Sequence, residues 1–287
     1  MKLIVAVLAG LFGTASALAA DLPARTYTKA PVMVDPGYNW SGLYAGGNIG
    51  YSWGRSSDTS SLTNGAGATL FTSTGSSNLD GVVGGGQIGY NWQVQNWVWG
   101  LEGDIQGTGE RGSRDFTCPI GVCTPSTTAP APGFFAGPTP IITTLGPAIP
   151  FTLTQKIDWF GTVRGRVGVL ATPRVLFYAT GGLAYGDVGT NETIGASSFS
   201  ASDLRVGYTV GAGIEGALGG NWTAKLEYLY VDLGRTSGSF ATAIAASGGG
   251  AVTSGTLTSA YSSRVTDNIL RVGLNYRFTS GPVVARY

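Results

Sequence analysis

The sequence predicts an all-β protein: an eight-stranded antiparallel transmembrane up-and-down β-barrel with four long extracellular loops and short periplasmic turns. Three observations support this fold class: an N-terminal export signal, eight segments of alternating apolar and polar residues, and connections that alternate between short and long. No segment after the signal approaches the roughly 18 continuous apolar residues of a membrane helix. A closed barrel is the other structure that satisfies every backbone polar group within lipid.

Residues 1–20 have the features of a secretory signal peptide. Lys2 supplies the positive charge, residues 3–12 form an apolar stretch too short to span a bilayer, and Ala17-Leu18-Ala19 fits the small-residue cleavage pattern. The mature chain is predicted to begin near residue 20 or 21. The proline-containing stretch 21–39 is predicted to be a periplasmic N-terminal lead.

Between residues 40 and 278, eight segments alternate with the period of two that is typical of β-strands. In the first segment, Leu43 and Ile49 share one face, and Asn48 and Ser52 share the other. The apolar faces carry almost no charge, and their Trp and Tyr residues cluster toward the segment ends. The opposite faces carry nine charged side chains: Glu102, Asp104, Arg164, Arg166, Glu215, Lys225, Glu227, Arg271 and Arg277.

The face rich in aromatic residues is predicted to meet lipid, because Trp and Tyr form girdles at both membrane interfaces of outer-membrane barrels. A soluble barrel would have the opposite arrangement, with an apolar interior and charges outside. The charged face then lines the lumen, where two roles are open. The acids and bases neutralise one another as a structural network, which we favour, or they line a passage and set its ion preference.

The connections predict the topology, since short turns face the periplasm and long loops face the exterior in this class. Tight turns are predicted around 95–96, 172–174 and 219–221. The barrel occupies 40–278, and 279–287 form a C-terminal extension. Phe278 is the candidate aromatic signal for the insertion machinery. Long loops rich in Ser, Thr, Gly and Ala are predicted near 54–78, 107–156, 187–203 and 233–266.

Four motifs carry a family resemblance: YNWSGLY at 38–44, DWFGTVRGR at 158–166, YATGGLA at 178–184 and RVGLNYRF at 271–278. With them the chain resembles the alphaproteobacterial outer-membrane immunogenic, porin-like family, whose barrel is similar to the transmembrane domain of OmpA. The likeness covers the whole mature chain except its loops. It implies an eight-stranded barrel and a role as a surface antigen, a small porin or an envelope-stabilising protein.

The chain contains no histidine, which excludes Ser-His-Asp and Cys-His nucleophilic sites and His-ligated zinc. It also weakens the case for haemin binding, known among relatives of this family, because only Tyr or Met could ligate the iron. Three Gly-x-Gly-x-x-Gly matches, at 84–89, 107–112 and 211–216, lack the helix of a dinucleotide site. No enzyme activity, catalytic residue, cofactor or metal site is predicted. The net charge of +1 gives no argument for nucleic acid.

Cys118 and Cys123 lie in the predicted second loop. In an oxidising compartment, two such cysteines are expected to pair and to fasten the loop. A metal or redox site is the functional alternative.

These features predict a protein of the Gram-negative cell outer membrane, exported through the periplasm, with a structural and antigenic role in the envelope. The first alternative is a narrow diffusion channel for ions or small hydrophilic solutes. The second is an adhesin or ligand receptor that acts through its long loops. The expected partners are outer-membrane lipid and lipopolysaccharide and the barrel insertion machinery, and the surface partner is left open.

Overall fold

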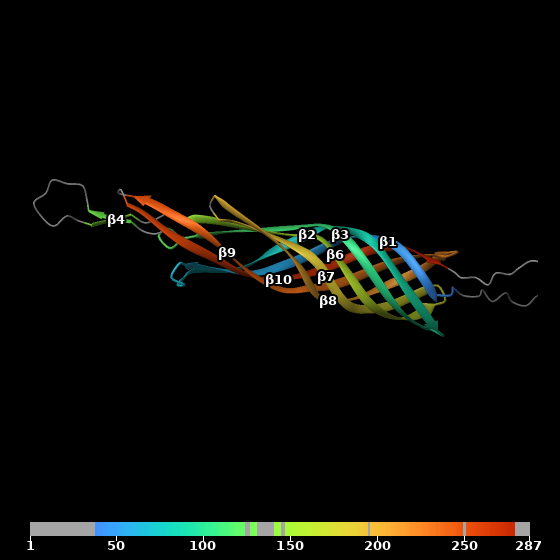
Figure 1. Ribbon diagram of the computed structural model, residues 1–287. Helices are drawn as coiled ribbons and strands as arrows, with labels where there is room; N and C mark the ends of the chain where they lie inside the picture. The colour runs from blue at the N-terminus through green and yellow to red at the C-terminus, as the bar shows by residue number, and fades with distance from the viewer. Residues whose placement is uncertain are drawn as a thin grey trace, which may run out of the picture. The chain divides into compact units, whose positions relative to one another are not determined.

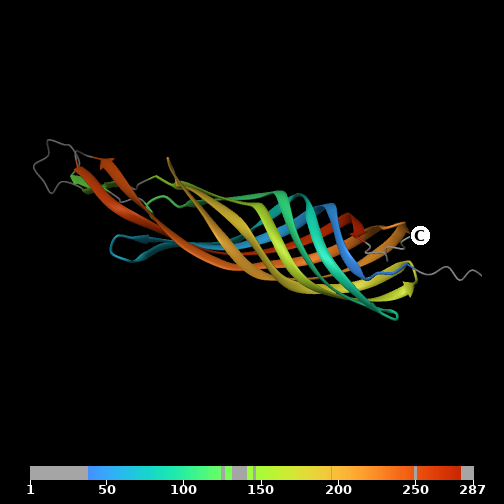
Figure 2. The ribbon, with the colours of Figure 1, turned by 45° about the vertical axis from the view of Figure 1, so that its right-hand side comes forward.

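Eight antiparallel strands close into a barrel in the computed structural model (Figures 1 and 2), which describes residues 38–123, 127–130, 141–144, 147–194, 196–248 and 251–278. The order around the barrel is β1-β10-β9-β8-β7-β6-β3-β2. The predicted all-β, eight-stranded antiparallel fold class is confirmed. In the described part of the chain, no helix is long and apolar enough to cross a membrane.

The barrel strands are 20 to 28 residues long. A separate two-stranded sheet is formed by β4 (Thr127–Pro130) and β5 (Ile141–Thr144). The barrel strands are β1 (Gly42–Asn64), β2 (Thr69–Val94), β3 (Trp97–Cys118), β6 (Ile149–Thr172), β7 (Val175–Ile194), β8 (Ser197–Gly219), β9 (Trp222–Gly248) and β10 (Ala251–Phe278).

The three tight turns join β2 to β3, β6 to β7 and β8 to β9, where the sequence predicts them. Two of these turns use left-handed backbone, at Gln95 with φ of 55° and at Gly220 with φ of 56°. Two-residue hairpins favour such residues because positive φ matches the right-handed twist of the flanking strands. On both sides of each turn, the two strands stay paired up to the residues that flank the turn. Short connections therefore close this end of the barrel.

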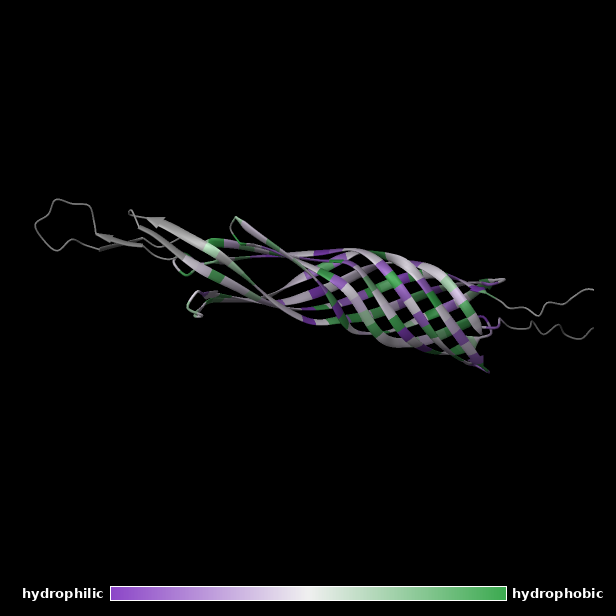
Figure 3. Ribbon diagram, in the orientation of Figure 1, coloured by the Kyte–Doolittle hydropathy of each residue, from purple (hydrophilic) through white to green (hydrophobic). Residues whose placement is uncertain are grey.

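The predicted face assignment is confirmed along all eight strands. Leu43, Ile49 and Leu101 point outward and are exposed, whereas Asn48 and Ser52 point inward and are buried. Figure 3 shows the resulting alternation of hydrophobic and hydrophilic bands across the closed part of the barrel. Outward aromatic rings gather at two levels, in the pairs Trp53–Tyr228, Trp159–Tyr185 and Tyr208–Tyr230 and in the pairs Tyr90–Trp92, Trp97–Trp99 and Trp222–Tyr276.

The segments predicted as long loops are largely strand, and this is a correction. Residues 54–64 extend β1, residues 69–78 extend β2, and the two meet at a short turn. In the same way, β9 and β10 continue as strands through most of residues 233–266. Ser, Thr and Gly here keep the period of two. Thr favours strands because it is β-branched, and neighbouring strands pair the backbone of the Ser and Gly residues, so a composition that indicates loops also forms strands.

Beyond the aromatic level of Trp53, Trp159 and Tyr208, the ring of strands divides into two sheets. The ladder between β2 and β3 ends at Asp80–Arg111, and the ladder between β8 and β9 ends at Tyr208–Asp232. Beyond these pairs, β2, β1, β10 and β9 form one sheet, and β3, β6, β7 and β8 form the other. A bulge on β9, with Gly234 at φ of 72°, lies where the division begins.

Several sequence predictions lie outside the described residues. The signal peptide at 1–20, residues 21–37 of the predicted lead at 21–39, and the extension at 279–287 belong to this group. Phe278 is described: it ends β10, pairs with Leu43 of β1 and exposes half of its surface on the outward face. Its role in insertion stays a prediction.

Candidate functional site: the barrel lumen

Charged side chains from five strands meet inside the barrel. They come from β3, β6, β8, β9 and β10, and all are at most 6% exposed. Four acids face four bases, so the group is neutral as a whole. We call it the lumen network: Glu102, Asp104, Arg164, Arg166, Glu215, Lys225, Glu227 and Arg271.

Strand geometry explains why these residues meet. Residues two apart on a strand share a face, so Glu102 and Asp104 both point inward. The strand register then sets acids opposite bases: Glu102 is directly opposite Arg164, Glu215 is opposite Lys225, and Glu227 is opposite Arg271. Opposite charges at paired positions stabilise a sheet.

Arg164 is the centre of the lumen network. Its Nη2 lies 2.5 Å from Glu102 Oε1 and 2.8 Å from Asp104 Oδ2, and its Nη1 lies 3.0 Å from Glu227 Oε1. The side chain has no solvent exposure. One guanidinium therefore holds three carboxylates from two strands, and each carboxylate is taken out of water.

Arg271 and Lys225 complete the neutralisation. Arg271 Nη2 lies 2.9 Å from Asp104 Oδ2 and 2.6 Å from Glu227 Oε2. Lys225 Nζ lies 2.9 Å from Glu102 Oε1. Each of these carboxylates thus contacts at least two cations, which offsets the large desolvation cost of burying it.

A second group lies toward the tight-turn end. Arg166 Nη2 lies 2.6 Å from Glu215 Oε2, and its guanidinium carbon lies 4.1 Å from the ring centre of Tyr178. Tyr44 donates to Glu102 Oε2 at 2.7 Å. Inward glycines make room for these rings, because a Cβ at Gly89 would come within 2.3 Å of Tyr44 Oη. Here aromatic side chains fill the space that the inward glycines leave.

Arg277 is not part of the lumen network, although the sequence groups it there. Its Nε lies 3.2 Å from Tyr38 Oη, and its Nη1 lies 3.2 Å from the Ser41 carbonyl oxygen. Its position near the end of β10 places it at the barrel rim, beyond the reach of the acids. Burial raises the pKa of the Tyr38 hydroxyl, although Arg277 acts in the other direction.

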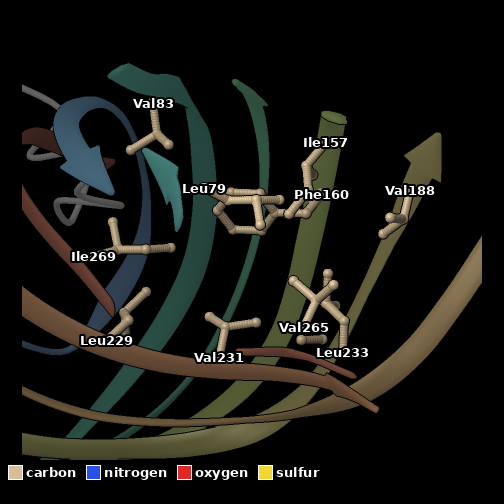
Figure 4. Close-up of a cluster of buried hydrophobic side chains, with 11 residues drawn as sticks. Leu79, Val83, Ile157, Phe160, Val188, Leu229, Val231, Leu233, Val265 and Ile269 are labelled. Atoms are coloured by element: carbon tan, nitrogen blue, oxygen red, sulfur yellow. The ribbon is translucent and has the colours of Figure 1, made fainter. Parts of the chain in front are cut away.

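An aliphatic layer fills the lumen above the network (Figure 4). Inward side chains from β2, β6, β7, β9 and β10 form it, and none exceeds 3% exposure. Sequence reasoning missed this layer, because it assigned a polar character to the whole inward face. The signal was present: Leu229 and Val231 follow Lys225 and Glu227 on the same face of β9. The layer consists of ten aliphatic residues and one aromatic residue: Leu79, Val83, Ile157, Phe160, Ala184, Val188, Leu229, Val231, Leu233, Val265 and Ile269.

Two further apolar groups close the ends of the lumen. At the tight-turn end, Trp40 is buried with Val98 and Leu176, and its Nε1 donates to the Pro173 carbonyl oxygen at 3.3 Å. At the far end, Cys118 and Cys123 form the predicted disulfide. Both half-cystines are buried in an apolar group with Leu62, Phe151, Ile194 and Leu257.

The comparisons agree with this geometry. A family model described as an outer membrane protein beta-barrel domain matches residues 5–278. The chain belongs to the outer-membrane β-barrel family. The 31 kDa outer-membrane immunogenic protein of Brucella melitensis is 34% identical in an alignment of 296 positions that covers 96% of this chain and 99% of that protein. The outer membrane is therefore the location of the protein.

Other proteins are similar to this outer-membrane barrel at lower identity. The 25 kDa outer-membrane immunogenic protein of Brucella abortus is 28% identical, over 82% of this chain and 85% of that protein. Among solved structures, Ail, the attachment invasion locus protein of Yersinia pestis, is 14% identical with a TM-score of 0.30, over 82% of this chain and 99% of that one. The two Brucella relatives carry the names of immunogenic membrane proteins and not of enzymes.

Proposed function

We propose that this outer-membrane barrel is a surface-displayed structural and antigenic protein of the envelope whose lumen does not conduct, and that it catalyses no reaction. The observation that carries the proposal is the fully buried Arg164, which is held by Glu102, Asp104 and Glu227. A conducting passage needs groups that exchange with hydrated ions, whereas these charges are bound to one another. The names of the Brucella relatives support an antigenic role.

The stacking of different layers in the lumen supports the same function. An ion that passed through would cross the Trp40 group, the lumen network, the aliphatic layer and the apolar group around the disulfide. Eight-stranded barrels leave an interior that side chains just fill. The barrel wall then serves as an anchor, and the division into two sheets above it presents long strands to the exterior.

Single-channel recording in planar bilayers tests the proposal. We expect the mature protein, refolded and inserted, to produce no reproducible conductance steps. Protein whose insertion is verified by protection from protease provides the necessary control. Regular steps whose size changes with Glu102→Gln, but not with Arg277→Ala, would instead establish the narrow diffusion channel.

A further inference from the structure

The outer half of β8, residues 197–207, is paired on one side only. All eleven of these residues follow the β7 ladder without a register shift. On the other side, the ladder with β9 begins at Tyr208–Asp232, so no strand within the described residues pairs with this stretch. Figure 2 shows the tip of the β7–β8 hairpin diverging from the β9–β10 arm.

The two sheets separate along two seams, one between β2 and β3 and one between β8 and β9. Side-chain hydrogen bonds bridge the seam between β2 and β3, and the seam at β8 differs in this respect. Between β2 and β3, Arg114 Nη2 donates to the Thr74 carbonyl oxygen at 2.8 Å and to Ser73 Oγ at 2.7 Å. At the β8 seam, the rings of Phe199 and Phe240 stack with their centres 5.3 Å apart, and among the described residues the two backbones approach each other only at the base, where Gly207 lies against the Asp232 carbonyl oxygen. This stacking leaves the main-chain groups of the β8 edge without a partner strand.

Natural proteins protect open edges with lysine, proline, bulges, shortness or inward-pointing charges. The stretch 197–207 reads SSFSASDLRVG and contains neither lysine nor proline, and it has no bulge. Its one arginine, Arg205, is such an inward charge and lies near the membrane-proximal end, so the outer residues 197–202 carry no protecting charge. The outward side chains at its outer end, Ser198, Ser200 and Ser202, are small and exposed, so they leave the backbone accessible.

We propose that this edge, which we call the β8 edge, binds an extended segment of an extracellular protein by strand addition. The segment would run antiparallel to β8 and hydrogen-bond its free main-chain groups. Alternate side chains of the segment would be apolar, to pack beside Phe199 and Phe240, and the others polar. The exposed carboxylate of Asp203 at the membrane-proximal end favours a basic residue at the N-terminal end of the segment.

A second copy of this chain fits the β8 edge less well. Two barrels in one membrane insert in the same direction, so two β8 edges that met side by side would pair in parallel. Every ladder of this barrel is antiparallel, and parallel pairing is slightly less stable for each residue. The inference goes beyond the envelope role, and a silent lumen neither supports nor contradicts it.

The first test uses backbone chemistry. The probe is a fluorescent peptide as long as the β8 edge, with alternating Thr and Val and an N-terminal Lys, added to the full-length mature protein in phospholipid nanodiscs. Two further probes carry N-methyl groups on alternate residues, one on the odd and one on the even positions. Since one set of amides faces the edge, we expect one methylated probe to bind and the other to lose about tenfold or more in affinity.

The second test asks whether the peptide binds at the β8 edge. Ser198→Lys with Ser200→Lys should weaken binding of the unmethylated probe by about tenfold or more. Ala260→Lys with Ser262→Lys is the matched control, because β10 is paired on both sides at these residues. We expect the control to bind like the wild type. No binding by the wild type, equal effects of both methylated probes, or equal effects of both variants would overturn the proposal. Dimers that the Ser198 and Ser200 changes dissociate would assign the edge to a second copy instead.

Discussion

At the scale of single residues, Arg164 and Arg277 show how position decides what a charge does. Both are arginines on the inward face of a strand. Arg164 lies at the level of the carboxylates and is fully buried, whereas Arg277 lies at the rim beside Tyr38 and Ser41. Arg164 is required to neutralise three acids. Water could take over the contacts that Arg277 makes.

Arg164→Ala should therefore destabilise the barrel strongly. Removal of one partner from a buried ion pair costs about 3–5 kcal/mol, because the remaining charges stay buried without compensation. The measurement is the free energy of unfolding in urea from lipid vesicles. Arg277→Ala is the control, with an expected loss of about 1 kcal/mol or less. Equal losses in the two variants would show that Arg164 has no special part in the network.

At the scale of elements, the pairing of the strands changes along their length. Near the tight turns, each strand pairs on both sides and its inward face meets the lumen network. Farther out, β2, β3, β8 and β9 pair on one side, and the two sheets face each other across the apolar group that contains the disulfide. The disulfide thus closes the short turn after β3 onto the interface between the sheets.

Replacement of Cys118 and Cys123 by Ala should act locally. The ring closed by the disulfide is short, so loop-closure entropy predicts a loss of about 2 kcal/mol. We expect faster cleavage of the outer strands by protease, while the closed part of the barrel keeps its resistance to denaturation by detergent. Reduction of the wild-type protein should reproduce this pattern. A variant that loses the whole barrel would show that the outer sheets and the membrane part unfold together.

At the scale of the whole barrel, the closed part and the divided part correspond to two environments. The closed part carries exposed apolar residues between two levels of aromatic rings, as a wall in lipid requires. The divided part carries Ser, Thr and Gly on its outward faces. Connections of a few residues join β1 to β2, β7 to β8 and β9 to β10, and the long connection from β3 to β6 contains β4 and β5. Because short turns face the periplasm in this class, the divided part is predicted to lie outside the cell.

Cysteine labelling on intact cells checks this orientation. A maleimide that cannot cross the membrane should label Ser239→Cys, which is exposed on the outer part of β9. It should not label Asn96→Cys, which is exposed in the turn between β2 and β3, until the outer membrane is opened. The reverse result would invert the predicted topology.

The amino-acid sequence by itself determines the membrane-embedded wall. The period of two is a local property, so Leu43, Leu101 and Val272 could be assigned to the lipid face without knowledge of their neighbours. The short turns and the eight segments followed from the same local signals. The nearby pair Cys118 and Cys123 could also be matched, because few alternatives exist for two cysteines in an exported chain.

Only the tertiary structure decides what fills the lumen and where the strands end. Whether Arg277 or Arg164 reaches an acid depends on the register between strands distant in the sequence, and register is a long-range quantity. The aliphatic layer around Leu229 forms because inward residues of five strands meet at one level. The outer strands continue through Ser- and Thr-rich sequence because a partner strand lies beside them. Pairing supplies the hydrogen bonds that local composition cannot reveal.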